Sequence, residues 1–192
     1  MADNIVHALE KQLGYPPLEK VDPNTQETTS EQYGGPHKLK LGQAAIPAVL
    51  EGLSKYYNSK TPLRQIYQPA TGNSWLEAIF GSRKEAAVQR VAEYADTDAN
   101  TAASEMERVA VAAVQLISNK YPDATSQQEV SEYLGGQRSH ILTRLPASMQ
   151  FGELLGDDTI DDRTNKMEGP ISSLMHKIED SFSGSTPKEK KD

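Results

Sequence analysis

Hydrophobic residues at helical spacing run through residues 39–58 and predict a long helix with one buried face. That face carries Leu39, Ile46, Val49, Leu50, Leu53 and Tyr57. The opposite face carries Lys40, Pro47, Glu51, Ser54 and Asn58. Proline normally interrupts a helix because it lacks an N–H donor. On the polar face the freed carbonyl of Gln43 can be hydrated, so we expect a bend at Pro47. A break into two helices at Ile46 is the alternative.

Serine and glutamate three residues apart mark three further helix starts, because such a pair can form a capping box. The pairs are Ser74 with Glu77, Ser82 with Glu85 and Ser126 with Glu129. Glycine is a common helix terminator. We therefore expect the first of these helices to end at Gly81 and the third to end at the pair Gly135–Gly136.

The segment from about Asn100 to Asn119 predicts another helix, and its second half is apolar on every side except at Gln115. A helix that is apolar all round is normally surrounded by other helices. We therefore expect residues 109–117 to lie at the centre of the fold.

Shorter amphipathic segments complete the pattern. Residues 5–13 predict a helix that ends at Gly14, Pro146 opens a helix that reaches Leu155, and residues 170–182 predict a last helix after an acidic loop. No useful stretch alternates with period two, as a half-buried strand would. The fold class predicted is all-α, a single compact array of about eight helices.

Proline and glycine divide the chain. Residues 15–37 lose all periodicity, so residues 1–37 predict a short helix followed by a flexible linker. Residues 38–182 predict the helical domain. The polar residues 183–192 predict a disordered tail.

Composition and charge argue against several classes of function. The net charge of −7 argues against a nucleic-acid partner, which normally requires a basic face. The absence of cysteine excludes disulfides and thiol chemistry and fits the cytoplasm. The N-terminus lacks the positive charge and continuous apolar run of a signal peptide. The most apolar run, residues 109–117, is shorter than the roughly twenty residues of a membrane span.

Two segments resemble the YidB-like proteins, a family of bacterial helical proteins of unknown function. The first is AAIPAVLEGL, in which Ile46-Pro47 precedes Val49, Leu50, Gly52 and Leu53. The second, similar to the family's C-terminal stretch, contains residues 137–141, Leu145-Pro146 and Leu154-Leu155-Gly156. The resemblance covers roughly residues 38–182. It implies an all-helical array from bacteria and no established activity, so it carries over no functional residues.

The acidic loop after Gly156 is the strongest candidate for metal chemistry. Asp157, Asp161 and Glu168 occupy the first, fifth and twelfth positions of a calcium-loop template. The sixth position, normally glycine for a sharp turn, is Asp162. A solvated acidic connection explains the same residues.

Motifs for catalysis and cofactor binding are missing from the sequence. The four histidines form neither HxxxH nor HExxH, and GxSxG, GxxxxGK and GxGxxG do not occur. We therefore expect no catalytic residues and no cofactor. The function predicted is a non-catalytic binding or scaffold module with a protein partner. The alternative is a metal-regulated protein or an enzyme that uses residues 157–168.

Apolar side chains near the end of the predicted domain indicate where a partner would bind. Met149, Phe151, Met175 and Phe182 belong to short helices that flank the acidic loop. Methionine suits surfaces that adapt to a partner, so we expect these residues to form a partner surface. The alternative is that they close the bottom of the core, as apolar helix faces usually do.

Overall fold

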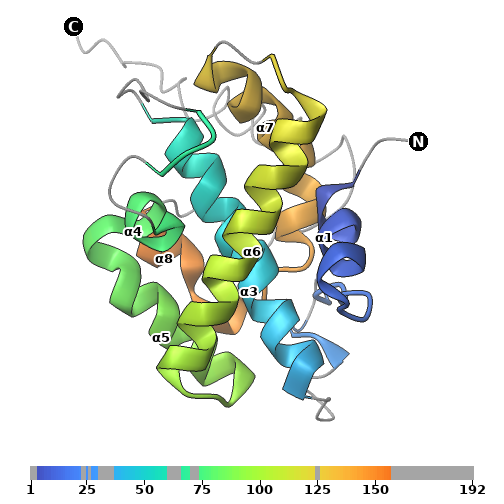
Figure 1. The fold of residues 1–192 in the computed structure, drawn as a ribbon. Coiled ribbons are helices and arrows are strands. Elements are labelled where there is room, and N and C mark those ends of the chain that lie inside the picture. Colours follow the sequence, from blue (N-terminus) through green and yellow to red (C-terminus); the bar gives the residue numbers. More distant parts are fainter. Residues whose placement is uncertain are drawn as a thin grey trace, which may run out of the picture.

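The computed structural model describes residues 4–22, 25, 27–29, 37–59, 66–69, 74–123 and 126–156 (Figure 1). In chain order the helices are α1 (Ile5–Leu13), α3 (His37–Tyr57), α4 (Trp75–Phe80), η1 (Gly81–Arg83), α5 (Lys84–Ala95), α6 (Ala99–Lys120), α7 (Gln127–Leu142), η2 (Ala147–Met149) and α8 (Phe151–Leu155). These described residues contain no strand, which confirms the all-α class. They contain fewer α-helices than the eight or so that the sequence predicts, and the helix predicted at 170–182 lies outside them.

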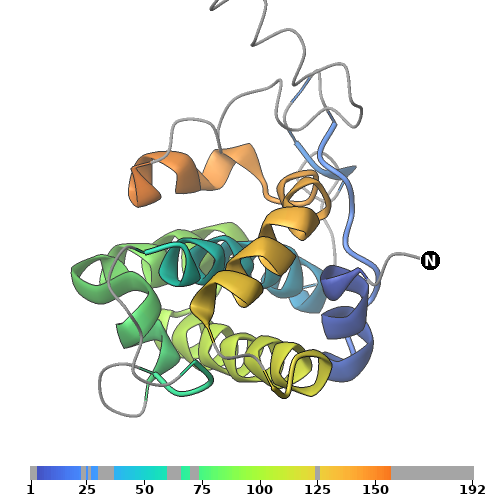
Figure 2. The ribbon, with the colours of Figure 1, turned by 90° about the horizontal axis from the view of Figure 1, so that it is seen from above.

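Helix α3 forms the centre of the array. It contacts α1, α4, α5, α6 and α7, and Figure 2 shows α6 along one side of it and α7 crossing it. Every residue from Leu41 to Leu53 is buried, whichever side of the helix it occupies. The helix continues through Pro47 without a break, so the predicted break at Ile46 is not found. The prediction that Pro47 and Glu51 face solvent is wrong, because both are buried.

The side-chain amide of Gln43 shows how α3 can bury a polar residue. The Gln43 side chain is fully buried, and its Oε1 accepts a hydrogen bond of 2.8 Å from the backbone N–H of Glu19. Its Nε2 donates to the carbonyl oxygens of Glu19 at 3.0 Å and Arg144 at 2.6 Å. A buried polar group costs little when its hydrogen bonds are made. Gln43 therefore joins the N-terminal segment, α3 and the residues that follow α7.

Helix α6 is an outer helix, which corrects the prediction that residues 109–117 are central. Val111 is 50% exposed and Gln115 is exposed, whereas Val114 and Ile117 are buried against the array. The apolar run misled because three of its nine residues are alanine, a strong helix former that suits either face of a helix.

The N-terminal segment packs on the helices, which corrects the prediction that a flexible linker begins at residue 15. Helix α1 contacts α6, α3 and α7, and Ile5, Val6 and Leu9 are almost completely buried. The chain after α1 is irregular but also packed: Tyr15, Leu18 and Val21 are buried.

Hydrogen bonds within this segment, and from it to α7 and Thr143, hold it in place. Buried Glu10 accepts from the backbone N–H of Leu18 at 2.8 Å, and the backbone N–H of Val21 donates to the Thr143 carbonyl at 2.8 Å. The Ile5 N–H donates to Gln137 Oε1 at 3.1 Å. These bonds satisfy an irregular backbone that would otherwise be costly to bury.

Helix boundaries follow the predicted caps in part. Ser74 accepts from the Glu77 N–H at 3.3 Å, and Glu107 of α6 also accepts from the Trp75 N–H at 2.7 Å. The cap predicted at Ser82 is wrong, because Ser82 lies in η1, which continues into α5. Ser126 is the N-cap of α7 but its side chain makes no capping bond. Asp98 caps α6, and a hydrogen bond from the Thr101 hydroxyl is the main reason its pKa is lowered.

Two glycines of α3 allow close packing. A Cβ at Gly42 would lie 2.6 Å from the Tyr15 ring, and one at Gly52 would lie 2.5 Å from Ile79 Cγ2 on α4. Both distances are too short for a real contact, so neighbouring elements approach α3 only because these side chains are absent.

We expect Gly52→Ala to lower the free energy of unfolding by about 1–3 kcal/mol, because α4 must move away from α3. Gly136→Ala is the matched control, since a Cβ there meets no atom within 4 Å. It should stabilise α7 by about 0.5–1 kcal/mol through helix propensity alone. Urea unfolding monitored by circular dichroism measures both. Equal stability of the two variants would contradict the packing of α4 on α3.

Candidate functional site

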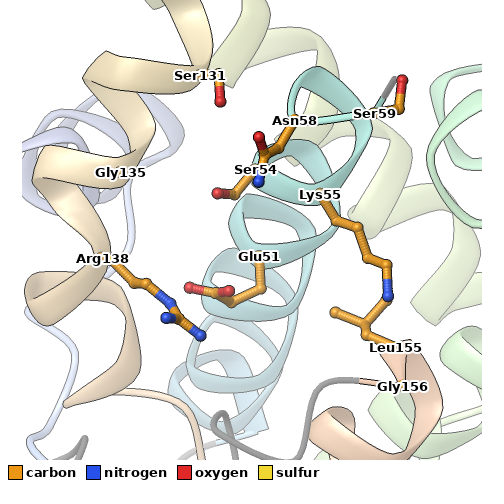
Figure 3. Close-up of a pocket in the computed structure, with 10 residues that line it drawn as sticks. All are labelled: Glu51, Ser54, Lys55, Asn58, Ser59, Ser131, Gly135, Arg138, Leu155 and Gly156. Carbon is orange, nitrogen blue, oxygen red and sulfur yellow. The ribbon is translucent and has the colours of Figure 1, made fainter. Parts of the chain in front are cut away.

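A groove of about 520 Å³, lined mainly by polar residues, opens between α3, α7 and the end of α8 (Figure 3). We call it the α3–α7 groove. Its lining residues are Glu51, Ser54, Lys55, Asn58, Ser59, Ser131, Gly135, Arg138, Leu155 and Gly156. Its volume is within the range of about 300–1,000 Å³ that is typical of small-molecule sites.

Helical spacing brings the polar groups together. Residues 51, 54, 55 and 58 of α3 and its end are three or four positions apart and share one face. Residues 131, 135 and 138 of α7 do the same on the facing helix. The groove is therefore formed by two polar helix faces that meet across the hollow.

Three charged side chains define the electrostatics of the groove. Glu51 is only 4% exposed although it lines the groove, whereas Lys55 is exposed and Arg138 is half-buried. Figure 3 shows the Glu51 carboxylate and the Arg138 guanidinium pointing toward each other from opposite walls. A buried carboxylate needs such compensation, because removal from water is costly for a charge. The Lys55 side chain extends along the groove toward Leu155.

Gly135 leaves one wall of the groove bare. It is exposed, and a Cβ built on it meets no atom within 4 Å. Glycine inside a helix costs about 0.5–1 kcal/mol relative to alanine. Gly136 is equally open but does not line the groove. The sequence predicts that α7 ends at this pair, whereas the helix continues to Leu142 and carries Arg138 to the groove.

The end of the groove is fixed by hydrogen bonds between its two main helices. Gln127, at the start of α7, donates from Nε2 to the carbonyl oxygens of Tyr57 at 3.3 Å and Ser59 at 2.8 Å. The Tyr57 hydroxyl donates to the Ile66 carbonyl at 2.7 Å, and burial raises the pKa of this tyrosine. The last turn of α3 and the first turn of α7 are thus joined.

The predicted partner surface is not exposed where the structure describes it. Met149 is 3% exposed and Phe151 is fully buried. The Phe151 ring meets Phe80 edge-on, with centroids 6.4 Å apart. These two residues close the core, which is the alternative that the sequence left open. The other partner residues, Met175 and Phe182, lie outside the described residues.

The predicted calcium ligands Asp157, Asp161 and Glu168 also lie outside the described residues. Within the described ranges, no three His, Cys, Asp or Glu side chains are grouped so that they could hold a metal ion. No helix in this part of the chain is long and apolar enough to span a bilayer.

A second hollow, of about 280 Å³, lies beside Arg90, and the hydrogen bonds of this arginine are structural. Arg90 donates to the carbonyl oxygens of Met149, at 3.2 Å, and Gln150, and to Glu153 Oε2 at 3.1 Å. Gln150 has a φ of +49°, a left-handed conformation that only a few non-glycine residues adopt. Arg90 therefore fixes the turn between η2 and α8.

No family model, curated protein or solved structure matches this chain. The resemblance to the YidB-like family stays a prediction. The α3–α7 groove is a candidate site because of its geometry and its charged residues.

Proposed function

We propose that this chain is a non-catalytic binding protein and that the α3–α7 groove receives a small polar molecule. One observation carries the proposal: Glu51 lines a hollow while only 4% exposed, and it faces Arg138. Charged side chains are rarely so buried unless they serve a pair or a site. Here Glu51 and Arg138 face each other beside a space large enough for a ligand.

The residues that line the groove favour binding over catalysis. They offer hydroxyls, an amide, a carboxylate and two cations, but neither histidine nor cysteine. Histidine is the usual general acid or base near neutral pH, and cysteine is intrinsically the most reactive nucleophile. The groove therefore holds and orients a solute.

The other expectations from the sequence remain compatible with this proposal. A YidB-like relationship would supply a helical scaffold and no established activity. A cytoplasmic location in a bacterium and a protein partner stay predictions. No observation on the described residues favours the alternative, a metal-regulated protein or an enzyme that uses residues 157–168.

A pair of leucine variants tests the proposal. Gly135→Leu fills the groove from the α7 wall, whereas Gly136→Leu adds the same side chain next to it, outside the groove. A library of small polar metabolites is screened by ligand-detected NMR. We expect compounds that bind the native protein and Gly136→Leu but not Gly135→Leu, because only the latter excludes them.

The same screen separates binding from catalysis. Bound compounds should be recovered unchanged after long incubation with the native protein, and conversion of any of them would show an enzyme. A set of compounds that bind all three proteins equally would place the site elsewhere. Both variants should keep the native circular dichroism spectrum, since each position is open.

A further inference from the structure

We infer that the ligand of the α3–α7 groove carries a single anionic group, a carboxylate or a phosphate. This inference rests on the proposed function and deepens it. It starts from the charges on the groove walls: Lys55 and Arg138 against Glu51. The buried Glu51 carboxylate offsets one cation, so one positive charge remains for a ligand.

The protein as a whole strengthens this argument. Its net charge is −7, so its average field repels anions. A groove whose lining residues carry a surplus of positive charge is the reverse of that average. Such a local reversal favours a small anion over a cation in the groove.

The two cations lie on opposite walls. Lys55 belongs to α3, and Arg138 belongs to α7. In Figure 3 the Lys55 side chain extends toward Leu155, and its flexible four-carbon stem must turn toward Arg138 before an anion can accept hydrogen bonds from both. The planar guanidinium suits the two oxygens of a carboxylate or phosphate, and the lysine ammonium adds a mobile point charge. Hydrogen bonds between charged groups are about twice as strong as neutral ones.

The remaining lining residues suit the rest of an organic anion. Gly135 lies three positions before Arg138, so the α7 wall is bare about one helical turn from this residue. A carbon skeleton can approach the helix backbone there. Ser54, Ser131 and Asn58 offer hydroxyl and amide groups for further polar substituents, and Leu155 offers one apolar contact.

The test is a titration of the full chain, followed by backbone amide NMR at constant ionic strength. The probes are acetate, inorganic phosphate, chloride and tetramethylammonium. We expect acetate and phosphate to shift amide signals of residues 51–59 and 131–138 saturably, with millimolar dissociation constants because each probe is minimal. Lys55→Gln should weaken both at least about tenfold, the loss of one charge-assisted hydrogen bond.

Matched variants guard against general charge effects and misfolding. Lys11→Gln removes one exposed positive charge from α1, far from the groove residues in the sequence, and should bind as the native protein does. Arg138→Gln should also bind at least about tenfold more weakly. Arg138→Lys keeps the charge beside Glu51 if the glutamine variant fails to fold, and should lose part of the affinity.

Each other outcome overturns the inference, and the outcomes distinguish it from the proposed function. If chloride gives the same shifts, or Lys55→Gln binds as tightly as the native protein, the anion site is wrong. If tetramethylammonium binds the groove and Glu51→Gln abolishes its binding, the groove is a binding site for cations. If neither these probes nor any library compound reaches the groove, both the inference and the proposed function fail.

Discussion

Removal of residues 1–36 will unfold the protein or remove most of its stability. The deletion takes away Ile5, Val6 and Leu9, which are almost completely buried against the other helices. Full burial of one such side chain contributes about 1.5–3 kcal/mol, and the total stability of a domain is about 5–15 kcal/mol. The deletion also leaves Gln43 and Gln137 without the backbone partners that the N-terminal segment provides.

The measurement is thermal unfolding by circular dichroism, with removal of residues 1–3 as the control. That control keeps Asn4, whose side chain accepts from the Val6 N–H at 3.0 Å and caps α1. It should melt as the full chain does. A cooperative transition near the native midpoint after removal of residues 1–36 would mean that this segment is not part of the core.

Val114→Asp should leave an unfolded or insoluble protein. Val114 is 5% exposed on the inner face of α6, so the substitution places a carboxylate in an apolar contact. An unpaired buried charge costs several kcal/mol, which is a large part of a domain's stability.

Val111→Asp is the matched control for this prediction. Val111 lies three residues before Val114 on the same helix but is 50% exposed. The substitution should change the free energy of unfolding by no more than about 0.5 kcal/mol. If α6 were surrounded on all sides, as the sequence predicts, neither variant would fold. A native-like melt of Val114→Asp would contradict the structure.

The sequence predicts the helices better than their places in the fold. Periodicity identified residues 39–58 as a buried helix, yet it assigned Glu51 to a solvated face. Burial near that face depends on contacts that are remote in sequence, such as those of Gln43 with residues 19 and 144. Local pattern carries no information on such contacts.

The N-terminal segment shows the same limit. Residues 15–22 lack periodicity because they form no helix or strand, and a lack of periodicity resembles a linker. Their burial comes from single side chains, Tyr15, Leu18 and Val21, together with hydrogen bonds to Glu10, Gln43 and Thr143. Only a folded array shows that these groups meet.

The sequence predicts one of the two walls of the candidate site, the wall formed by α3. Glu51, Ser54 and Asn58 formed the recognised polar face of the first long helix. The α7 wall is not predicted, because the pair Gly135–Gly136 predicts the end of this helix. Arg138 would then lie outside the helix. An uninterrupted helix to Leu142 would have placed Ser131, Gly135 and Arg138 on one face.

The difference between Gly135→Leu and Gly136→Leu tests the central claim, that the α3–α7 groove is a binding site, most directly. The two variants add the same side chain to neighbouring open positions of one helix, and only the first lines the groove. We expect small polar ligands that bind the native protein and Gly136→Leu and fail to bind Gly135→Leu. Ligands that bind both variants with native affinity would contradict this claim.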